Sequence, residues 1–153
     1  MSSWRARRNR ILVAVHRTLF LASRGRLAGR LAGMPVVMIT STGHATGQRR
    51  RTMLTVPVRD GEQLVLVASD GGNPHHPDWF LNLRADPRVE VTSEGRTRPM
   101  VAAIARPEEK ARLWPAVVAA YAGYAEYQQR SPRDIPLVLL QLSPAPTPPA
   151  NGS

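Results

Sequence analysis

Residues 40–54 combine glycine, hydroxyl and arginine residues in an order typical of an anion-binding loop. The segment reads Thr-Ser-Thr-Gly-His-Ala-Thr-Gly-Gln-Arg-Arg-Arg-Thr-Met-Leu. Gly43 and Gly47 would let the backbone turn with its N–H groups exposed, and guanidinium groups can grip a phosphate or carboxylate through paired hydrogen bonds. Because strand side chains alternate, at most two of the three arginines at 49–51 can serve one ligand. The alternative is an ordinary turn followed by solvated arginines.

Ser69 follows an apolar segment directly, so its hydroxyl group would stand at the end of a strand. No Gly-x-Ser-x-Gly surrounds it and no catalytic triad is visible. We therefore expect this hydroxyl to form a hydrogen bond at the edge of a ligand rather than to act as a nucleophile. His75 and His76 are consecutive and point apart, and no third ligand is placed by the spacing, so we expect no metal site there.

Tyr121, Tyr124 and Tyr127 recur at a spacing of three, which on a helix would place their rings along one face. Two interpretations remain open for this stripe. The rings could pack at the core or its rim, or they could form a lid whose phenol groups orient or protonate a flat ligand.

The composition limits the class of protein. The chain has 153 residues, which suits one domain, and no cysteine, which excludes disulfides, thiolate metal sites and a cysteine nucleophile. No apolar run reaches the ~18 residues that span a bilayer, and no signal peptide is evident. Of the net charge of +10, residues 1–59 contribute twelve arginines and no acid, which predicts anionic partners. We expect a cytoplasmic protein.

The N-terminal segment 4–31 has the pattern of a basic amphipathic helix. Apolar residues from Ile11 to Leu19 share one face, and arginines at a spacing of seven, from Arg10 to Arg24, share the opposite face. The helix could pack against the rest of the protein or lie on an anionic membrane surface at the inner face of the cell membrane, or its first residues could be disordered. No nucleic-acid-binding motif accompanies the charge, so we expect no nucleic acid partner.

Strand and turn signals alternate through the rest of the chain. The expected strands are 36–40, 53–58, 63–68, 88–93, 96–105 and 136–142. Helices are expected to begin at Pro77 and Pro107 and to end near residues 86 and 122.

Two tight-turn signals, Asp-Gly at 60–61 and Glu-Gly at 94–95, predict hairpins. They pair 53–58 with 63–68 and 88–93 with 96–105. The fold class is therefore α+β, a small barrel of about six strands with flanking helices. We divide the chain into an N-terminal helix at 1–33, a barrel at 34–142 and a disordered Pro-rich tail at 143–153.

Several segments, taken in order, resemble the deazaflavin-dependent nitroreductase family over about residues 34–142. They are 36–43, 59–61, 68–72, 77–87, 124–128 and 133–136. The most specific is Pro-Asp-Trp-Phe-Leu-Asn-Leu-Arg-Ala-Asp-Pro, because it follows Ser-Asp-Gly-Gly. The resemblance implies a split β-barrel of the flavin-binding type. It also implies coenzyme F(420), a deazaflavin with a phospholactyl and oligoglutamate tail.

The resemblance also implies a set of site residues. Those expected along the coenzyme are His44, Ala45, Thr46, Arg50, Arg51, Thr52, Met53, Leu54, Thr55, Val67, Ala68, Ser69, Asp70, Asp78, Trp79, Phe80, Leu81, Asn82 and Tyr124. Those expected to be catalytic, near the substrate, are Ser69, Tyr121, Tyr124 and Tyr127. Arg50 falls on the family's own basic position, so we expect it to hold the tail.

The function implied is transfer of a hydride from the reduced deazaflavin to a quinone, a nitroaromatic or an activated enone. His44 and Ala45 stand where the family commonly has basic residues, Asp70 where a basic or neutral residue is frequent, and Met53 where proline is usual. FMN is therefore kept as an alternative cofactor. A protein that binds deazaflavin, flavin or haem without turnover is kept as the alternative function.

Overall fold

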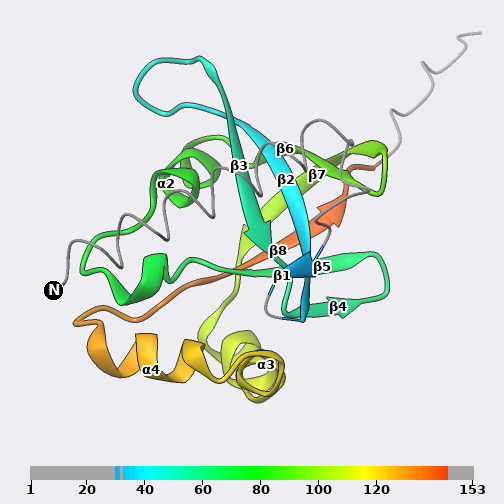
Figure 1. Ribbon diagram of the computed structural model, residues 1–153. Coiled ribbons are helices and arrows are strands. Elements are labelled where there is room, and N and C mark those ends of the chain that lie inside the picture. Colours follow the sequence, from blue (N-terminus) through cyan, green and yellow to red (C-terminus); the bar gives the residue numbers. More distant parts are fainter. Residues whose placement is uncertain (1–29, 32, 145–153) are drawn as a thin grey trace, which may run out of the picture.

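The computed structural model describes residues 30–31 and 33–144, and in this part of the chain eight strands form one antiparallel sheet that curls into a half-barrel (Figure 1). The strands are β1 (Arg30–Leu31), β2 (Met34–Thr42), β3 (Arg49–Thr55), β4 (Val58–Asp60), β5 (Gln63–Val67), β6 (Arg88–Ser93), β7 (Arg96–Ile104) and β8 (Leu137–Leu142). Their order is β1-β2-β6-β7-β8-β5-β4, and β3 pairs with β2 outside this path.

Helices flank both faces of the sheet. They are α2 (Asp78–Ala85), α3 (Pro107–Ala120), α4 (Gly123–Arg130) and a single 3-10 turn, η1 (Asp70–Gly72). Of the helices in the described residues, none is long and apolar enough to cross a membrane. The α+β split-barrel class expected from the sequence is confirmed.

Alternate side chains of β5 enter two hydrophobic clusters on opposite faces of the sheet. Leu64 and Leu66 join the cluster that includes buried side chains of α2, whereas Val65 and Val67 join the cluster that includes side chains of α3 and α4. Burying a side chain of this size stabilises the fold by roughly 1.5–3 kcal/mol. Because β5 is buried on both faces, it fixes the position of the residues that follow it, beginning with Ala68.

The two helices and the second hairpin follow the sequence prediction closely. Pro77 is the N-terminal capping residue of α2, and Asp86 ends this helix. In the turn between β6 and β7, Glu94 and Gly95 both have positive φ values, 50° and 79°, as a two-residue hairpin turn requires.

Two expected elements are wrong in their bounds. Residues 53–58 do not form one strand: β3 pairs with β2, and only β4 forms the hairpin with β5. Pro57 separates the two strands because it has no N–H group to donate to a ladder, while the N–H of Val56 donates to the carbonyl of Pro35 at 2.8 Å. The helix expected at 4–31 is wrong at its last two positions, because Arg30 and Leu31 form β1 against β2. The rest of that helix, and the tail from residue 145, lie outside the described residues.

Candidate functional site

The loop between β2 and β3 is closed by its own backbone. The N–H of Gly43 donates to the carbonyl of Gln48 at 2.7 Å, and the N–H of Gly47 donates to the carbonyl of Gly43 at 2.8 Å. The N–H of His44 donates to Oδ1 of Asn82 at 2.9 Å, and the ring Nδ1 of His44 lies 2.7 Å from the same oxygen. Because an amide oxygen only accepts, we assign the ring proton to Nδ1. The expectation that the glycines leave N–H groups exposed is therefore wrong for these three groups. His44 fastens the loop to α2.

The charge of this region comes from β3 itself. Arg49 is paired with Glu90 at 2.6 Å. Arg50 reaches only the hydroxyl of Thr46, at 3.5 Å, and neither Arg50 nor Arg51 forms an ion pair within the described residues. Both side chains are exposed, so two uncompensated guanidinium groups stand near the start of this strand.

The remaining β3 positions face different surroundings. Thr52, Met53, Leu54 and Thr55 are all half-buried. Met53 packs against the small cluster of Val36 and Met38, and Leu54 packs against the core that α2 covers.

The far end of β3 meets a cluster of three tyrosines. The hydroxyl of Thr55 lies 2.8 Å from the hydroxyl of Tyr124. The ring of Tyr121 lies 5.3 Å from that of Tyr124 and 6.3 Å from that of Tyr127, and the phenol oxygens of Tyr121 and Tyr127 are 3.5 Å apart. The single helical stripe expected from the spacing is wrong, because Tyr121 ends α3 in an extended conformation and α4 begins at Gly123. The ring of Tyr121 folds over Gly123, where a Cβ would stand 2.4 Å from its Cε1.

The surroundings of Tyr124 and Tyr127 raise the pKa of both phenols. Burial raises the pKa of Tyr124 above its ordinary value. The hydrogen bond with Tyr121, followed by burial, raises the pKa of Tyr127 to about 12. At neutral pH both phenols can donate a hydrogen bond or a proton, and neither can act as a base.

Ser69 follows the end of β5, as the sequence suggested, and the loop that it begins lies beside α4. Its side chain is buried, and its hydroxyl forms no hydrogen bond with any described residue. The backbone then turns through three positive φ values, 44° at Asp70, 66° at Gly71 and 85° at Gly72. A Cβ on Gly72 would stand 3.0 Å from the carbonyl oxygen of Tyr127, so the loop packs directly on α4.

The predicted positions on either side of this loop mostly face the core. Val67, Ala68, Trp79, Phe80 and Asn82 are buried, Leu81 is half-buried, and Asp78, Asp70, Ala45 and Thr46 are exposed. The side chains of Trp79 and Phe80 belong to the cluster beneath α2. They hold that helix against the sheet.

Arg133 is a site residue that the sequence did not reveal. Its guanidinium donates to the carbonyl groups of Ala68 and Ser69 at 3.0 and 3.2 Å and to that of Asn73 at 3.0 Å, and it lies 3.2 Å from Nδ1 of His76. It reaches the serine loop from a position more than sixty residues further along the chain, and no spacing rule connects segments so far apart. Its presence in the segment 133–136 that resembles a known family was the only signal.

The two consecutive histidines have no metal-binding geometry. His76 stacks on Phe80, with ring centroids 4.6 Å apart, and within the described residues no group of three His, Cys, Asp or Glu side chains could hold a metal ion.

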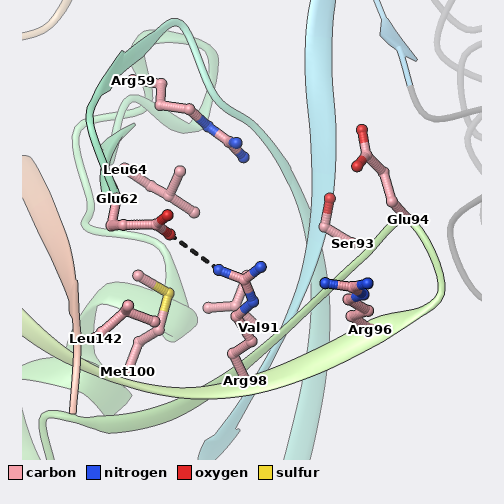
Figure 2. Close-up of a pocket in the computed structure, with 10 residues that line it drawn as sticks. All are labelled: Arg59, Glu62, Leu64, Val91, Ser93, Glu94, Arg96, Arg98, Met100 and Leu142. Carbon is pink, nitrogen blue, oxygen red and sulfur yellow. Dashed lines mark hydrogen bonds and ion pairs between the residues drawn. The ribbon is translucent and has the colours of Figure 1, made fainter. Parts of the chain in front are cut away.

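A cavity of about 420 Å³ lies elsewhere, between the turns after β4 and β6 and the end of β8 (Figure 2). Buried Leu64, Val91 and Met100 form part of its lining, and Arg98 is paired with Glu62 at 2.9 Å on its rim. None of the predicted site residues lines it. A long ligand can lie along an exposed strand without a closed cavity, so we place the candidate site at β3, the serine loop and the tyrosines.

Comparison with known proteins finds a family match over most of the chain. Residues 11–141 match the model of the F(420)H(2)-dependent quinone reductase family. An F(420)H(2)-dependent quinone reductase of Mycobacterium tuberculosis is 37% identical over 133 residues, which are 84% of this chain and 89% of that protein. A putative F(420)H(2)-dependent quinone reductase of the same organism is 31% identical over 124 residues, 81% of this chain and 88% of that protein.

Solved structures agree with the sequence matches. A protein described as an F(420)-H2 dependent reductase superposes with a TM-score of 0.63 at 36% identity, covering 70% of this chain and 94% of that one. A haem-binding protein from Mycobacterium smegmatis, at 20% identity and a TM-score of 0.52 over 72% of this chain and 47% of that one, shows a shared fold only.

Proposed function

Because this chain belongs to the F(420)H(2)-dependent quinone reductase family, we propose that it transfers a hydride from the reduced deazaflavin coenzyme F(420) to a quinone. The protein is thus an oxidoreductase whose redox chemistry belongs to the coenzyme. The protein's own part is to hold the coenzyme and the acceptor and to supply a proton.

The observation that carries this proposal is the two-ended character of β3. At one end Arg50 and Arg51 form no ion pair within the described residues and point to opposite faces of the strand, so that one of them serves a given ligand, and Thr55 joins the other end to the phenol of Tyr124. The five residue steps along the strand from Arg50 to Thr55 span roughly 17 Å. Figure 1 shows β3 running from the protruding loop toward the side of the molecule that carries α4. The strand therefore offers two separate binding places, one for the anionic tail of a ligand and one for the flat ring of the same ligand.

The residues present fit such a coenzyme on two grounds. Guanidinium groups bind the phosphate and carboxylates of the tail through paired hydrogen bonds, and neither Arg50 nor Arg51 must break an ion pair within the described residues to do so. The hydroxyl of Ser69 forms no hydrogen bond with a described residue and is available to hydrogen-bond the ring or the acceptor.

The phenols are suitable donors of the proton that a quinone oxygen must take up after the hydride has been transferred. The raised pKa values of Tyr124 and Tyr127 keep both groups protonated at neutral pH. The half-buried phenol of Tyr127 can donate a hydrogen bond to the acceptor oxygen on which charge develops, whereas Tyr124 is buried and held by Thr55 beneath it. Nitroaromatics and activated enones are further acceptors of the same hydride, and we propose them as alternative substrates.

One titration tests the proposal. Oxidised F(420) is added to the protein and its fluorescence is followed, with FMN in a parallel titration, and the reduced coenzyme is then mixed with menadione. We expect micromolar or tighter binding of the deazaflavin and oxidation of its reduced form by the quinone. No binding of either cofactor would refute the proposal, and binding without turnover would identify a carrier instead.

The tail-binding role is tested by Arg50→Ala. Loss of a charge-assisted contact should weaken coenzyme binding by about tenfold and reduce its dependence on salt. Arg112→Ala, an exposed arginine on α3, is the matched control and should leave affinity unchanged. If both variants bind alike, Arg50 does not hold the tail.

A further inference from the structure

Arg133 directs its whole guanidinium at the backbone of one loop and at one imidazole. Nε donates to the carbonyl of Asn73 at 3.0 Å, Nη2 donates to the carbonyls of Ala68 and Ser69 at 3.0 and 3.2 Å, and Nη1 lies 3.2 Å from Nδ1 of His76. Arg133 forms no ion pair within the described residues. Within the described residues this half-buried cation hydrogen-bonds only to carbonyl groups and an imidazole, and the charge of Asp70 in the same loop also attracts it, so it fixes the shape of the backbone around it.

The loop that it contacts has a strained backbone. Asp70 has a φ of 44°, a left-handed conformation that costs a non-glycine residue of order 1 kcal/mol or more, and Gly71 and Gly72 follow with φ values of 66° and 85°. The loop's own backbone bonds include one from the N–H of Gly72 to the carbonyl of Ser69 at 2.8 Å. Arg133 therefore holds the same carbonyl that closes the turn.

Arg133 is itself held from α3 and α4. The side chain of Gln128 donates to the carbonyl of Arg133 at 2.9 Å and accepts from the N–H of Ile135 at 2.9 Å. Lys110 donates to the same Gln128 oxygen at 3.1 Å and pairs with Asp134. These contacts fix the backbone on both sides of Arg133, from which its side chain extends to the loop.

The loop in turn sets the distance between Ser69 and the tyrosines. Gly72 packs against the backbone of Tyr127, with 3.0 Å between its would-be Cβ and the carbonyl oxygen of Tyr127. Arg130, on the next turn of α4, also donates to the carbonyl of Gly71 at 3.2 Å. A shift of the loop would move the Ser69 hydroxyl relative to the phenols.

We propose that Arg133 is a positioning residue, which clasps the loop 68–73 so that the unpartnered hydroxyl of Ser69 and the phenol of Tyr127 keep a fixed separation. The clasp needs a planar group that donates in several directions, which arginine provides and lysine does not. The inference rests on the proposed function in one respect, that Ser69 meets the ligand.

The first test is hydrogen exchange in the free protein, which needs no coenzyme. In Arg133→Lys, we expect the amides of Gly72 and Asn73 to exchange about tenfold faster or more, because two or more charge-assisted hydrogen bonds are lost. Amides in the centre of β8 should be unchanged. Arg112→Lys is the matched control. Unchanged loop amides, or an equal increase across the whole protein, would overturn the clasp.

The second test separates positioning from direct contact with the ligand. Arg133→Lys should lower kcat for menadione about tenfold while changing the KM for reduced coenzyme less than threefold, and in a Ser69→Ala background the same change should have little further effect. Full additivity of the two substitutions would show that Arg133 does not act through Ser69 and would overturn the inference. If the wild-type protein fails to oxidise reduced F(420), the proposed function falls, and the exchange experiment still decides whether the clasp exists.

Discussion

The hydrogen bond between Thr55 and Tyr124 predicts an unequal effect of removing its two partners. Tyr124 is 5% exposed, whereas Thr55 is half-buried. Thr55→Val leaves a buried phenol whose remaining hydrogen-bond acceptor among the described residues is the sulfur of Met34, at 3.9 Å. Tyr124→Phe leaves only the hydroxyl group of Thr55 without its partner, and water can reach this group. The order of the two free-energy changes follows from burial alone.

The magnitudes follow from the same contacts. An unsatisfied buried polar group costs about 1–3 kcal/mol, and the net loss of a hydrogen bond whose other partner is rehydrated costs about 0.5–1.5 kcal/mol. We therefore expect Thr55→Val to lower the free energy of unfolding more than Tyr124→Phe. The double variant should be more stable than Thr55→Val alone, because no polar group is then left unpaired.

Urea denaturation followed by circular dichroism measures all three variants without any coenzyme. Thr52→Val is the matched control, since Thr52 is also a half-buried residue of β3, and its side chain forms no hydrogen bond with a described residue. A cost of Tyr124→Phe equal to or above that of Thr55→Val would refute the argument. So would a double variant whose cost is the sum of the two single costs.

Three further predictions concern titration and close packing. Tyr127 should ionise near pH 12 in an absorbance titration, and Tyr121→Phe should bring this midpoint down toward 10. Because folding raises the pKa of Tyr127, the stability that this phenol contributes is complete below pH 10 and is lost as the pH rises through about 12. Burial, together with the charges of Arg133 and Arg84, lowers the pKa of His76, so the stability of the protein should fall as the pH drops below 6.5. His76→Gln should lessen this fall, as measured by denaturation curves at about pH 7 and pH 5. Gly123→Ala should cost about 1–3 kcal/mol and slow turnover by displacing the Tyr121 ring, whereas Gly61→Ala, which meets no atom within 4 Å at a φ of 59°, should cost stability without slowing turnover.

Local signals in the sequence were sufficient for most of the elements. Pro77 and Asp86 bound α2, and Glu94 and Gly95 turn between β6 and β7, because each of these residues acts on the backbone at its own position. The pairing partner of β3 could not be found in this way. An adjacent turn signal favoured β5, whereas the structure pairs β3 with β2 along its full length.

The candidate site was less accessible to sequence reasoning. The arginines of β3 were visible as a run, but which of them lacks a partner depended on Glu90, which pairs with Arg49 from forty-one residues away. The tyrosine spacing was visible too, yet the helix breaks between Tyr121 and Gly123, so the rings meet by a fold of the backbone rather than by helical periodicity. Contacts between distant segments have no signature in either segment alone.

The contacts of Arg133 with the loop 68–73 also determine the order in which parts of the protein can form during synthesis. The bond of Arg133 to the carbonyl of Ala68 joins positions sixty-five residues apart, and such distant contacts form late because a long loop must close first. During synthesis, residues 40–104 can leave the ribosome and begin to pair while the serine loop still has no guanidinium to hold it. The loop can take its final shape only after α3, α4 and the segment carrying Arg133 have been made. A nascent chain arrested before residue 133 lacks β8, which joins β7 to β5, so it should contain the pairing of β2 with β3 and β6 and of β6 with β7, but no formed site.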